Sequence, residues 1–239
     1  MLAAIRLCAG PHGVLLIVKN YTGDKLNFKL AAEIAKTQYS INVETVVIGD
    51  DVSLLPDEPS HEASQPASVG ARGLAGVVLL HKIVGAFAAT GAPLCQVAEL
   101  ARRVASSIST MGVGLTPCPV PALGRPTFSL ADDEMEVSLF QQVYNNTILA
   151  YFYFIFNQVG LGIHGEHGAY KQKLTTADNV TDKLIAKILN HLPAPHNNEN
   201  NRQNVPVVVL LNNLGSLTHM ELAIVARRTL HVLTGPINR

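Results

Sequence analysis

Two short apolar runs near the amino-terminal end predict a parallel sheet. The first follows Gly13 and reads Val-Leu-Leu-Ile-Val, a branched run that is typical of a buried strand. A polar loop from Lys19 to Asp24 comes next, then a helical pattern over 26–36, and then the second apolar run over 43–48. A strand, a helix and a strand at this spacing form a βαβ unit, so the pattern predicts an α/β fold with a largely parallel first sheet.

The rest of the chain continues the α/β pattern. A loop rich in Pro, Ser and Glu covers 53–69, and a proline-rich extended or turn-like segment covers 116–126. Further helices are expected over 76–90, 94–107, 176–191 and from about 219 to 230, and a further strand over 205–211. We therefore interpret the chain as two α/β subdomains, over 1–136 and 159–239.

The segment 137–158 between these subdomains has a different composition from both. It contains no charged residue. The whole chain has 7 Phe and 6 Tyr residues, and seven of these aromatic residues lie in this segment. Its apolar run over 148–156 is too short to cross a bilayer as a helix. We treat 137–158 as an anomalous aromatic insertion.

Composition and charge narrow the function classes. Of 239 residues, 48% are hydrophobic, which is ample for a buried core, and 18 basic side chains balance 18 acidic ones. This balance gives no indication of a nucleic-acid surface or of binding to an anionic membrane. The three cysteines, Cys8, Cys95 and Cys118, are scattered and lack the spacing of a zinc or redox site. A reducing, cytosolic compartment is the simplest interpretation.

The polar loop after the first strand is the first candidate site. Ligands of open α/β sheets bind at the carboxyl ends of the strands, where Lys19 and Asp24 are expected. Asp24 could act as a base towards a small hydroxylated substrate, with Lys19 anchoring its oxygen atoms. The alternative, favoured by composition alone, is a solvated turn in which Asp24 caps the next helix.

The glycine-rich segment 160–168 is the second candidate. His164 stands between glycines in Gly-Ile-His-Gly-Glu, so a ligand could approach its imidazole closely, and that ring can act as nucleophile or base. The alternative is a loop histidine that bonds to the backbone. A metal site from His164, Glu166 and His167 is disfavoured, because the spacing matches no zincin pattern.

The third candidate is the turn Asn212–Ser216, which precedes a helix. Its backbone could bind an anion at the helix N-terminus, or it could be an ordinary strand-to-helix turn. The sequence holds no GxxxxGK[ST] phosphate-binding loop.

Several motifs, in order and spacing, resemble the substrate domain of the dihydroxyacetone (glycerone) kinase family. They are GVLLIVKNYTGDKLNFKLAAEIA (13–35), ARGLAGVVLLHKIVGAFAATGA (71–92), STMGVGLTPCPVPALGRPTFSLADDEMEV (109–137), GLGIHGEHG (160–168), KLTTADNVTDKLI (173–185) and LLNNLGSLTHMELAIVAR (210–227). The style is closer to the ATP-dependent eukaryotic enzymes, which include triokinase/FMN cyclases, than to the bacterial phosphotransferase-linked ones.

The resemblance implies a covalent mechanism. His164 would add to the carbonyl of dihydroxyacetone or glyceraldehyde to form a hemiaminal, Lys19 would bind substrate oxygens, and Asp24 would take the proton of the attacking hydroxyl. It also implies that ATP and Mg²⁺ are bound by a separate, all-helical (DhaL-type) domain, and that the substrate domain forms a homodimer. Nothing in these residues indicates the FAD-splitting cyclase activity of the animal relatives.

The chain departs from the family pattern in three places. It is expected to start after a GGSGHEP-type loop that completes the family's substrate pocket, and to stop before the substrate domain is finished. Deletion of 137–158 restores the family's continuous EMEVGLGIHGE, so we interpret this segment as a translated intron, the alternative being a genuine apolar insertion. The leading interpretation is the triose-binding part of a kinase. The alternatives are a non-catalytic triose-binding module and an inactive truncated product.

Overall fold

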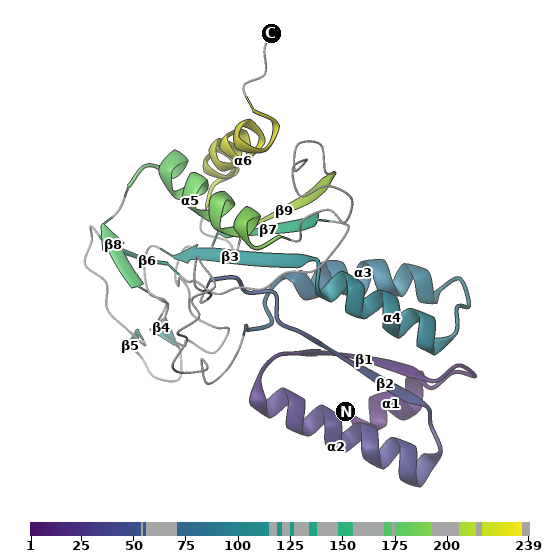
Figure 1. Cartoon of the computed structure of the whole chain (residues 1–239). Helices are drawn as coiled ribbons and strands as arrows, with labels where there is room; N and C mark the ends of the chain where they lie inside the picture. The colour runs from purple at the N-terminus through teal and green to yellow at the C-terminus, as the bar shows by residue number, and fades with distance from the viewer. Residues whose placement is uncertain are drawn as a thin grey trace, which may run out of the picture.

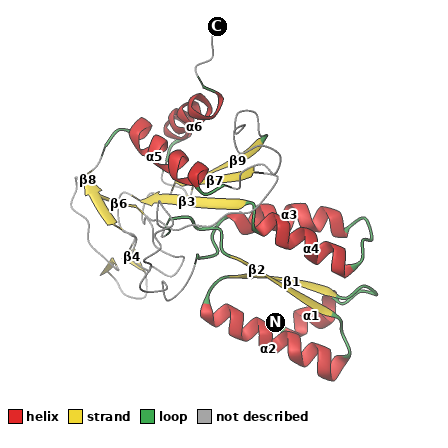
Figure 2. Ribbon diagram, viewed as in Figure 1, coloured by secondary structure: helices red, strands yellow, loops and turns green. Residues whose placement is uncertain are grey.

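The computed structural model describes residues 1–53, 55, 71–114, 119–120, 125–126, 134–137, 148–154, 170–173, 175–192, 206–213 and 217–235. These residues form an α/β protein with two main sheets, each covered by helices (Figures 1 and 2). The expected fold class, with two α/β units, is confirmed.

The first unit has three layers, with a parallel strand pair between two layers of helices. Strands β1 (Val14–Lys19) and β2 (Val43–Ile48) run in register from Val14 opposite Val43 to Lys19 opposite Ile48. Helices α1 (Leu2–Cys8) and α2 (Thr22–Tyr39) pack on one face, and α3 (Gly76–Ala88) and α4 (Leu94–Ala105) pack on the other (Figure 1).

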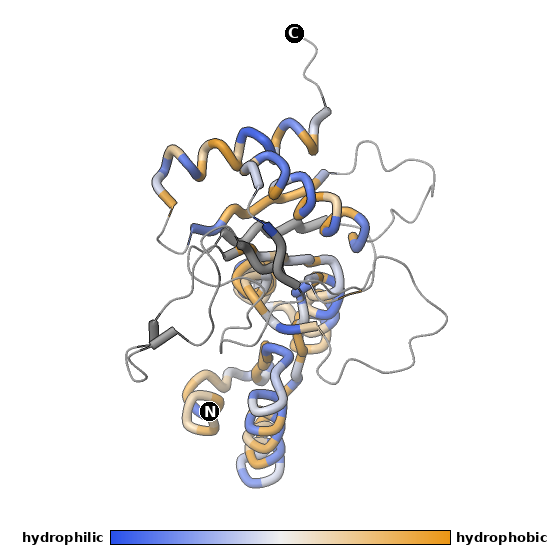
Figure 3. Tube along the Cα trace, turned by 90° about the vertical axis from the view of Figure 1, so that its left-hand side faces the viewer, coloured by the Kyte–Doolittle hydropathy of each residue, from blue (hydrophilic) through white to orange (hydrophobic). Residues whose placement is uncertain are grey.

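Alternation along β1 explains why both faces are covered. Leu16 and Val18 are buried against α1 and α2, whereas Leu15 and Ile17 pack towards α3 and α4. A strand whose neighbouring residues all meet apolar partners appears in the sequence as a continuous apolar run. In Figure 3, apolar residues (orange) alternate with polar residues (blue) along the helices, as expected for helices that bury one face.

The second unit is built on a five-stranded sheet in the order β8-β6-β3-β7-β9. Its strands are β3 (Ile108–Gly114), β6 (Glu134–Val137), β7 (Ile148–Phe154), β8 (Tyr170–Lys173) and β9 (Val207–Asn213). Strands β3, β7 and β9 are parallel, and β6 is antiparallel to both β3 and β8. Short strands β4 (Pro119–Val120) and β5 (Arg125–Pro126) form a separate antiparallel pair.

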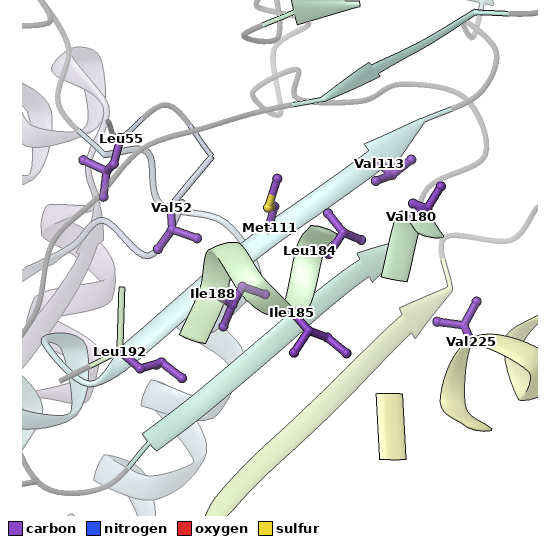
Figure 4. Close-up of a cluster of buried hydrophobic side chains, with 10 residues drawn as sticks. All are labelled: Val52, Leu55, Met111, Val113, Val180, Leu184, Ile185, Ile188, Leu192 and Val225. Carbon is purple, nitrogen blue, oxygen red and sulfur yellow. The ribbon is translucent and has the colours of Figure 1, made fainter. Parts of the chain in front are cut away.

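Helices α5 (Ala177–Asn190) and α6 (His219–Thr234) cover one face of this sheet. Figure 4 shows Leu184, Ile185 and Ile188 of α5 pointing at the strands, beside Met111 and Val113 of β3. This cluster is the main core of the second unit, and it extends to Val52 and Leu55 of the loop that leaves β2. The two units therefore share buried contacts.

The backbone also connects the units directly. Asp51, just beyond β2, forms an isolated parallel bridge with Thr110 of β3. The Val52 amide donates to the Thr110 carbonyl at 2.9 Å, and the Thr110 amide donates to the Asp50 carbonyl at 2.6 Å. The carboxyl end of β2 is thus fixed to β3.

The predicted elements match with shifted ends, but several strands of the second unit were not predicted. The expected strand over 43–48 is confirmed as β2, and the predicted helix over 26–36 begins earlier, at Thr22, and extends to Tyr39. Strand β3 was not predicted, because Ile-Ser-Thr-Met-Gly-Val-Gly contains too few consecutive apolar residues. It lies within the range 1–136 yet pairs in the second sheet, and the division at 137–158 stays a prediction.

Candidate active site

The first candidate loop begins where β1 ends. Lys19 is the last residue of β1, is half-buried, and lies opposite Ile48 of β2. The Asn20 amide donates to the Ile48 carbonyl at 2.9 Å, so the ladder continues one residue beyond the strand. The Lys19 side chain is therefore held at the carboxyl edge of the sheet, where α/β proteins bind ligands.

Asp24 lies in the first turn of α2, five positions after Lys19. The helix starts after Tyr21, whose extended backbone provides the N-cap without a side-chain hydrogen bond. A carboxylate in the first turn is favoured by the partial positive charge of the helix N-terminus. The N-cap of α2 is Tyr21 and not Asp24, so the capping role in the alternative is wrong, whereas the choice between a solvated turn and a substrate site stays open. Its side chain is half-buried at the same edge of the sheet as Lys19.

A buried carboxylate, Asp50, follows β2 at this edge. Its Oδ1 accepts from the Leu74 amide and its Oδ2 accepts from the Gly76 amide, both at 2.7 Å, and the Thr110 hydroxyl also donates to Oδ2. Gly76 is the first residue of α3, so Asp50 binds the N-terminus of that helix. Burial raises the pKa of Asp50 above its ordinary value, although these hydrogen bonds oppose the shift.

The neighbouring Asp51 forms a buried ion pair with Arg72. Arg72 donates to Oδ2 of Asp51 from Nε at 2.7 Å and from a terminal nitrogen at 2.6 Å. Oδ1 accepts from the amide and hydroxyl of Ser53, and the Asp51 amide donates to the Arg72 carbonyl at 3.0 Å. Burial raises the pKa of Asp51, and the Arg72 charge opposes this.

This network was missed in the sequence, where Gly49-Asp50-Asp51 appeared only as a strand end. The available signal was a pair of carboxylates directly after a buried parallel strand, together with Arg72 just before a helix. Burial decides their role, since charged side chains are almost never fully buried without partners.

The segment 71–73 connects the aspartates to the Lys19 loop. The Asn20 side chain donates from Nδ2 to the Ala71 carbonyl at 2.6 Å. Gly73 lies so close to β1 that an added Cβ would meet Cβ of Lys19 at 2.7 Å and Cα of Lys19 at 2.9 Å. Only glycine fits at 73 without displacement of Lys19.

A groove of about 420 Å³ lies beside the loop, between α2 and β2. Lys25, Lys29 and Glu33 of α2 and Thr45 and Val47 of β2 are among its lining residues. Lys19 and Asp24 do not line it, so we do not assign it to the substrate.

The remaining predicted residues fall in two groups. His164, with Glu166 and His167, lies outside the described residues, as does the 214–216 part of the third candidate turn. In that turn, the Asn213 side chain donates to the Leu217 carbonyl at 2.6 Å and accepts from the Leu217 amide at 3.2 Å. These bonds favour the ordinary strand-to-helix turn.

The described part of the chain offers neither a metal-binding cluster nor a membrane-spanning helix. No group of three His, Cys, Asp or Glu side chains there could hold a metal ion. None of its helices has the length and apolar character needed to span a membrane.

Comparisons with known proteins agree with this geometry. The family model of the Dak1 domain matches residues 1–139 and 157–236. The triokinase/FMN cyclase of Homo sapiens is 40% identical over 243 residues, covering 98% of this chain and 35% of that protein. The dihydroxyacetone-binding subunit DhaK of a PTS-dependent dihydroxyacetone kinase of Listeria innocua is 36% identical, covering 87% of this chain and 52% of that protein.

Solved structures give the same result. The native dihydroxyacetone kinase of C. freundii superposes with a TM-score of 0.71 at 34% identity, covering 98% of this chain and 35% of that one. The same kinase in complex with AMP-PNP and Mg²⁺ gives a TM-score of 0.68. A dihydroxyacetone kinase operon co-activator, Dha-DhaQ, gives 0.71 at 29% identity, covering 97% of this chain and 60% of that one.

The fold is thus an α/β domain of the kind found in dihydroxyacetone kinases. The chain belongs to the Dak1 domain family. It spans about a third of the human triokinase/FMN cyclase and about half of the Listeria subunit.

Proposed function

We propose that this chain is the triose-binding part of an ATP-dependent dihydroxyacetone or glyceraldehyde kinase. The observation that carries the proposal is the position of Lys19 and Asp24, in a segment matched by the Dak1 model, at the carboxyl edge of β1. The relatives in which the matching domain occurs are named triokinase and dihydroxyacetone-binding subunit.

Capture of the substrate is assigned to His164. Its imidazole nitrogen adds to the carbonyl carbon of the ketone or aldehyde, and a proton passes to the carbonyl oxygen, which gives a hemiaminal. A triose offers little surface for non-covalent affinity, so a covalent bond supplies both affinity and selection against glycerol, which has no carbonyl.

Phosphoryl transfer is assigned to the loop after β1. Lys19 donates hydrogen bonds to substrate oxygens, and Asp24 accepts the proton of the terminal hydroxyl as that oxygen attacks the γ-phosphate. ATP and Mg²⁺ are supplied by a separate ATP-binding domain. The named complex of the C. freundii kinase with AMP-PNP and Mg²⁺ supports these cofactors for the family. We further propose a homodimer and a cytosolic location.

A second candidate is a non-catalytic module that binds a triose and signals to a partner. The likeness to an operon co-activator favours it. A binding module needs His164 but not the base, so the presence of Asp24 favours the kinase.

A reconstituted assay tests the choice. The purified chain is mixed with a separately expressed ATP-binding domain of a relative, ATP, Mg²⁺ and dihydroxyacetone, and triose phosphate is measured. The kinase proposal predicts product that depends on both proteins. Capture of dihydroxyacetone without product in this mixture would favour the binding module instead.

A further inference from the structure

The buried aspartates at the end of β2 contact no residue that we have assigned to the substrate. They bind the segment 71–76 from one side, through the Leu74 and Gly76 amides and through Arg72. The other side of that segment contacts Asn20 and Lys19. A continuous chain of short contacts therefore connects the two aspartates to the polar loop 19–24.

We infer that Asp50 and Asp51 are positioning residues, which fix the segment 71–76 and thereby hold Lys19 in place for the substrate. This inference deepens the proposed function, because it rests on Lys19 as a substrate-binding residue. It adds Asp50, Asp51, Arg72 and Gly73 to the residues that determine how the triose is held.

The first step of the coupling rests on three buried charged side chains. Asp50 and Asp51 are each 1% exposed and Arg72 is 3% exposed. Asp50 accepts hydrogen bonds from two backbone amides, one just before α3 and one at its first residue. The segment therefore cannot shift without breaking hydrogen bonds to a buried carboxylate.

The second step is steric. Gly73 lies against Cα and Cβ of Lys19 and against the Ile48 carbonyl, which an added Cβ would approach to 2.8 Å. Gly49 is equally close to the segment, since an added Cβ there would meet the Ala71 carbonyl at 2.5 Å. Movement of 71–73 is therefore transmitted to the backbone of Lys19.

The third step is polar. The bond from Asn20 Nδ2 to the Ala71 carbonyl joins the residue after Lys19 to the same segment. If the aspartate contacts were lost, the segment 71–73 could move, and Asn20 would move with it because of this hydrogen bond.

Hydrogen exchange of the whole chain, read by mass spectrometry, tests the inference without any substrate. The variant Asp50→Asn keeps the side-chain volume, but it places an amide group that donates hydrogen bonds where two backbone amides need acceptors. We expect exchange of the amides in 19–25 and 71–78 to become about tenfold faster, with no change in 177–190. Asp178→Asn, an equivalent change at a half-buried aspartate paired with Arg227, should leave 19–25 unchanged.

Two results would overturn the inference. One is unchanged exchange in 19–25 in Asp50→Asn, and the other is an equal increase throughout the chain, which is the sign of a merely structural role. If Asp50→Asn does not fold, Arg72→Lys gives the same comparison, because it keeps the charge but loses the paired guanidinium donors to Asp51.

A substrate readout separates this inference from the proposed function. In Gly73→Ala, the dihydroxyacetone concentration that half-fills the covalent adduct should rise by about tenfold or more, because the new methyl group displaces Lys19. An unchanged half-filling concentration would contradict the coupling. Absence of an adduct in the unsubstituted chain would contradict the proposed function alone, and the exchange result would still decide whether Asp50 positions Lys19.

Discussion

Lys19 and Asp24 take their places from one short polar loop. Lys19 ends β1 and Asp24 lies in the first turn of α2, so two different elements hold the two side chains. Both residues could be selected from the sequence, because a polar loop after a buried parallel strand is where α/β ligands bind. Their partners could not, since the contacts of Gly73 and Asn20 join residues about fifty positions apart.

Asp24 and Lys19 should be separable by kinetics. We expect Asp24→Asn to retain capture of dihydroxyacetone, because the base is needed only when the hydroxyl attacks phosphate, and to lower phosphoryl transfer by about 10²–10⁴-fold. Lys19→Met should weaken capture as well, because it removes the donor to the substrate oxygens. Adduct mass and product formation in the reconstituted assay measure the two steps. Equal loss of both steps in Asp24→Asn would rule out its role as the base.

The two buried aspartates should give the stability of the protein an unusual pH dependence. An unperturbed Asp titrates near 3.8, and burial raises the pKa of Asp50 in the folded chain. The folded state therefore holds this proton more tightly, and the free energy of unfolding falls as pH rises from 3.8 to the folded pKa. Asp50→Asn removes this contribution, so its stability should fall less across that window.

Urea unfolding at a series of pH values measures the effect, with Asp182→Asn as the contrasting variant. The hydrogen bonds from Arg228 lower the pKa of Asp182, so its contribution is present above 3.8 and is lost as pH falls through the lower folded value. The two variants should thus change the pH dependence with opposite sign. The same sign for both would contradict the assignment of Asp50 as a desolvated carboxylate.

At the scale of elements, the backbone conformation at the end of a helix cannot be derived from the pattern of apolar residues. Helix α2 ends at Ser40, whose φ of 53° lies in the left-handed region that favours glycine. Its amide donates to the Ala35 carbonyl, as a C-terminal cap requires. Because Ser40 has a Cβ, this conformation costs free energy at this position.

Ser40→Gly should therefore stabilise the protein by about 1 kcal/mol, because the left-handed conformation costs a residue with a Cβ about this much. Thermal or urea unfolding measures the change. Ser106 ends α4 at a φ of −78°, where glycine has no such advantage, so Ser106→Gly should give no gain. A gain in both variants would show that the backbone conformation is not the cause.

The elements that the sequence failed to predict share one physical cause. Strand β3 contains Ser, Thr and two glycines, and it is a strand because β6 and β7 pair with it on both sides. Strand β7 lies within 137–158, and it too is defined by its neighbours β3 and β9. Both strands depend on pairing with segments that are distant in the sequence, and local pattern does not record such pairing.

At the scale of the molecule, the insertion occupies a specific place. Residues 140–156 fall outside the Dak1 match, yet β7 separates β3 from β9. Leu149 pairs with Ile108 on one side and with Val208 on the other, so β3 and β9 run parallel and level with each other. We propose that 137–158 is a translated intron. Without this segment, β3 and β9 would pair directly with each other, after moving closer together by about 4.8 Å.

Deletion of 137–158 tests this proposal in the protein. The shortened chain should unfold cooperatively, with a higher midpoint and a higher soluble yield, because a charge-free aromatic segment is removed. Loss of cooperative unfolding would show that β7 is an integral strand. Transcript sequencing is the independent check, and abundant reads that keep these codons would contradict the intron.

Fold class and family could be predicted because several motifs recur in order over most of the chain. The assembly of the site could not be predicted, since Asp50, Arg72 and Gly73 act through burial and close packing that no spacing records. The roles of Lys19, Asp24 and His164 stay predictions.

The most direct test of the central claim is native mass spectrometry of the purified chain in dihydroxyacetone. The account predicts a single added substrate mass that is absent with glycerol and absent in His164→Ala, whose stability should match that of the unsubstituted chain. No adduct in the folded, unsubstituted chain, or an adduct that persists in His164→Ala, would contradict capture of the triose at this histidine.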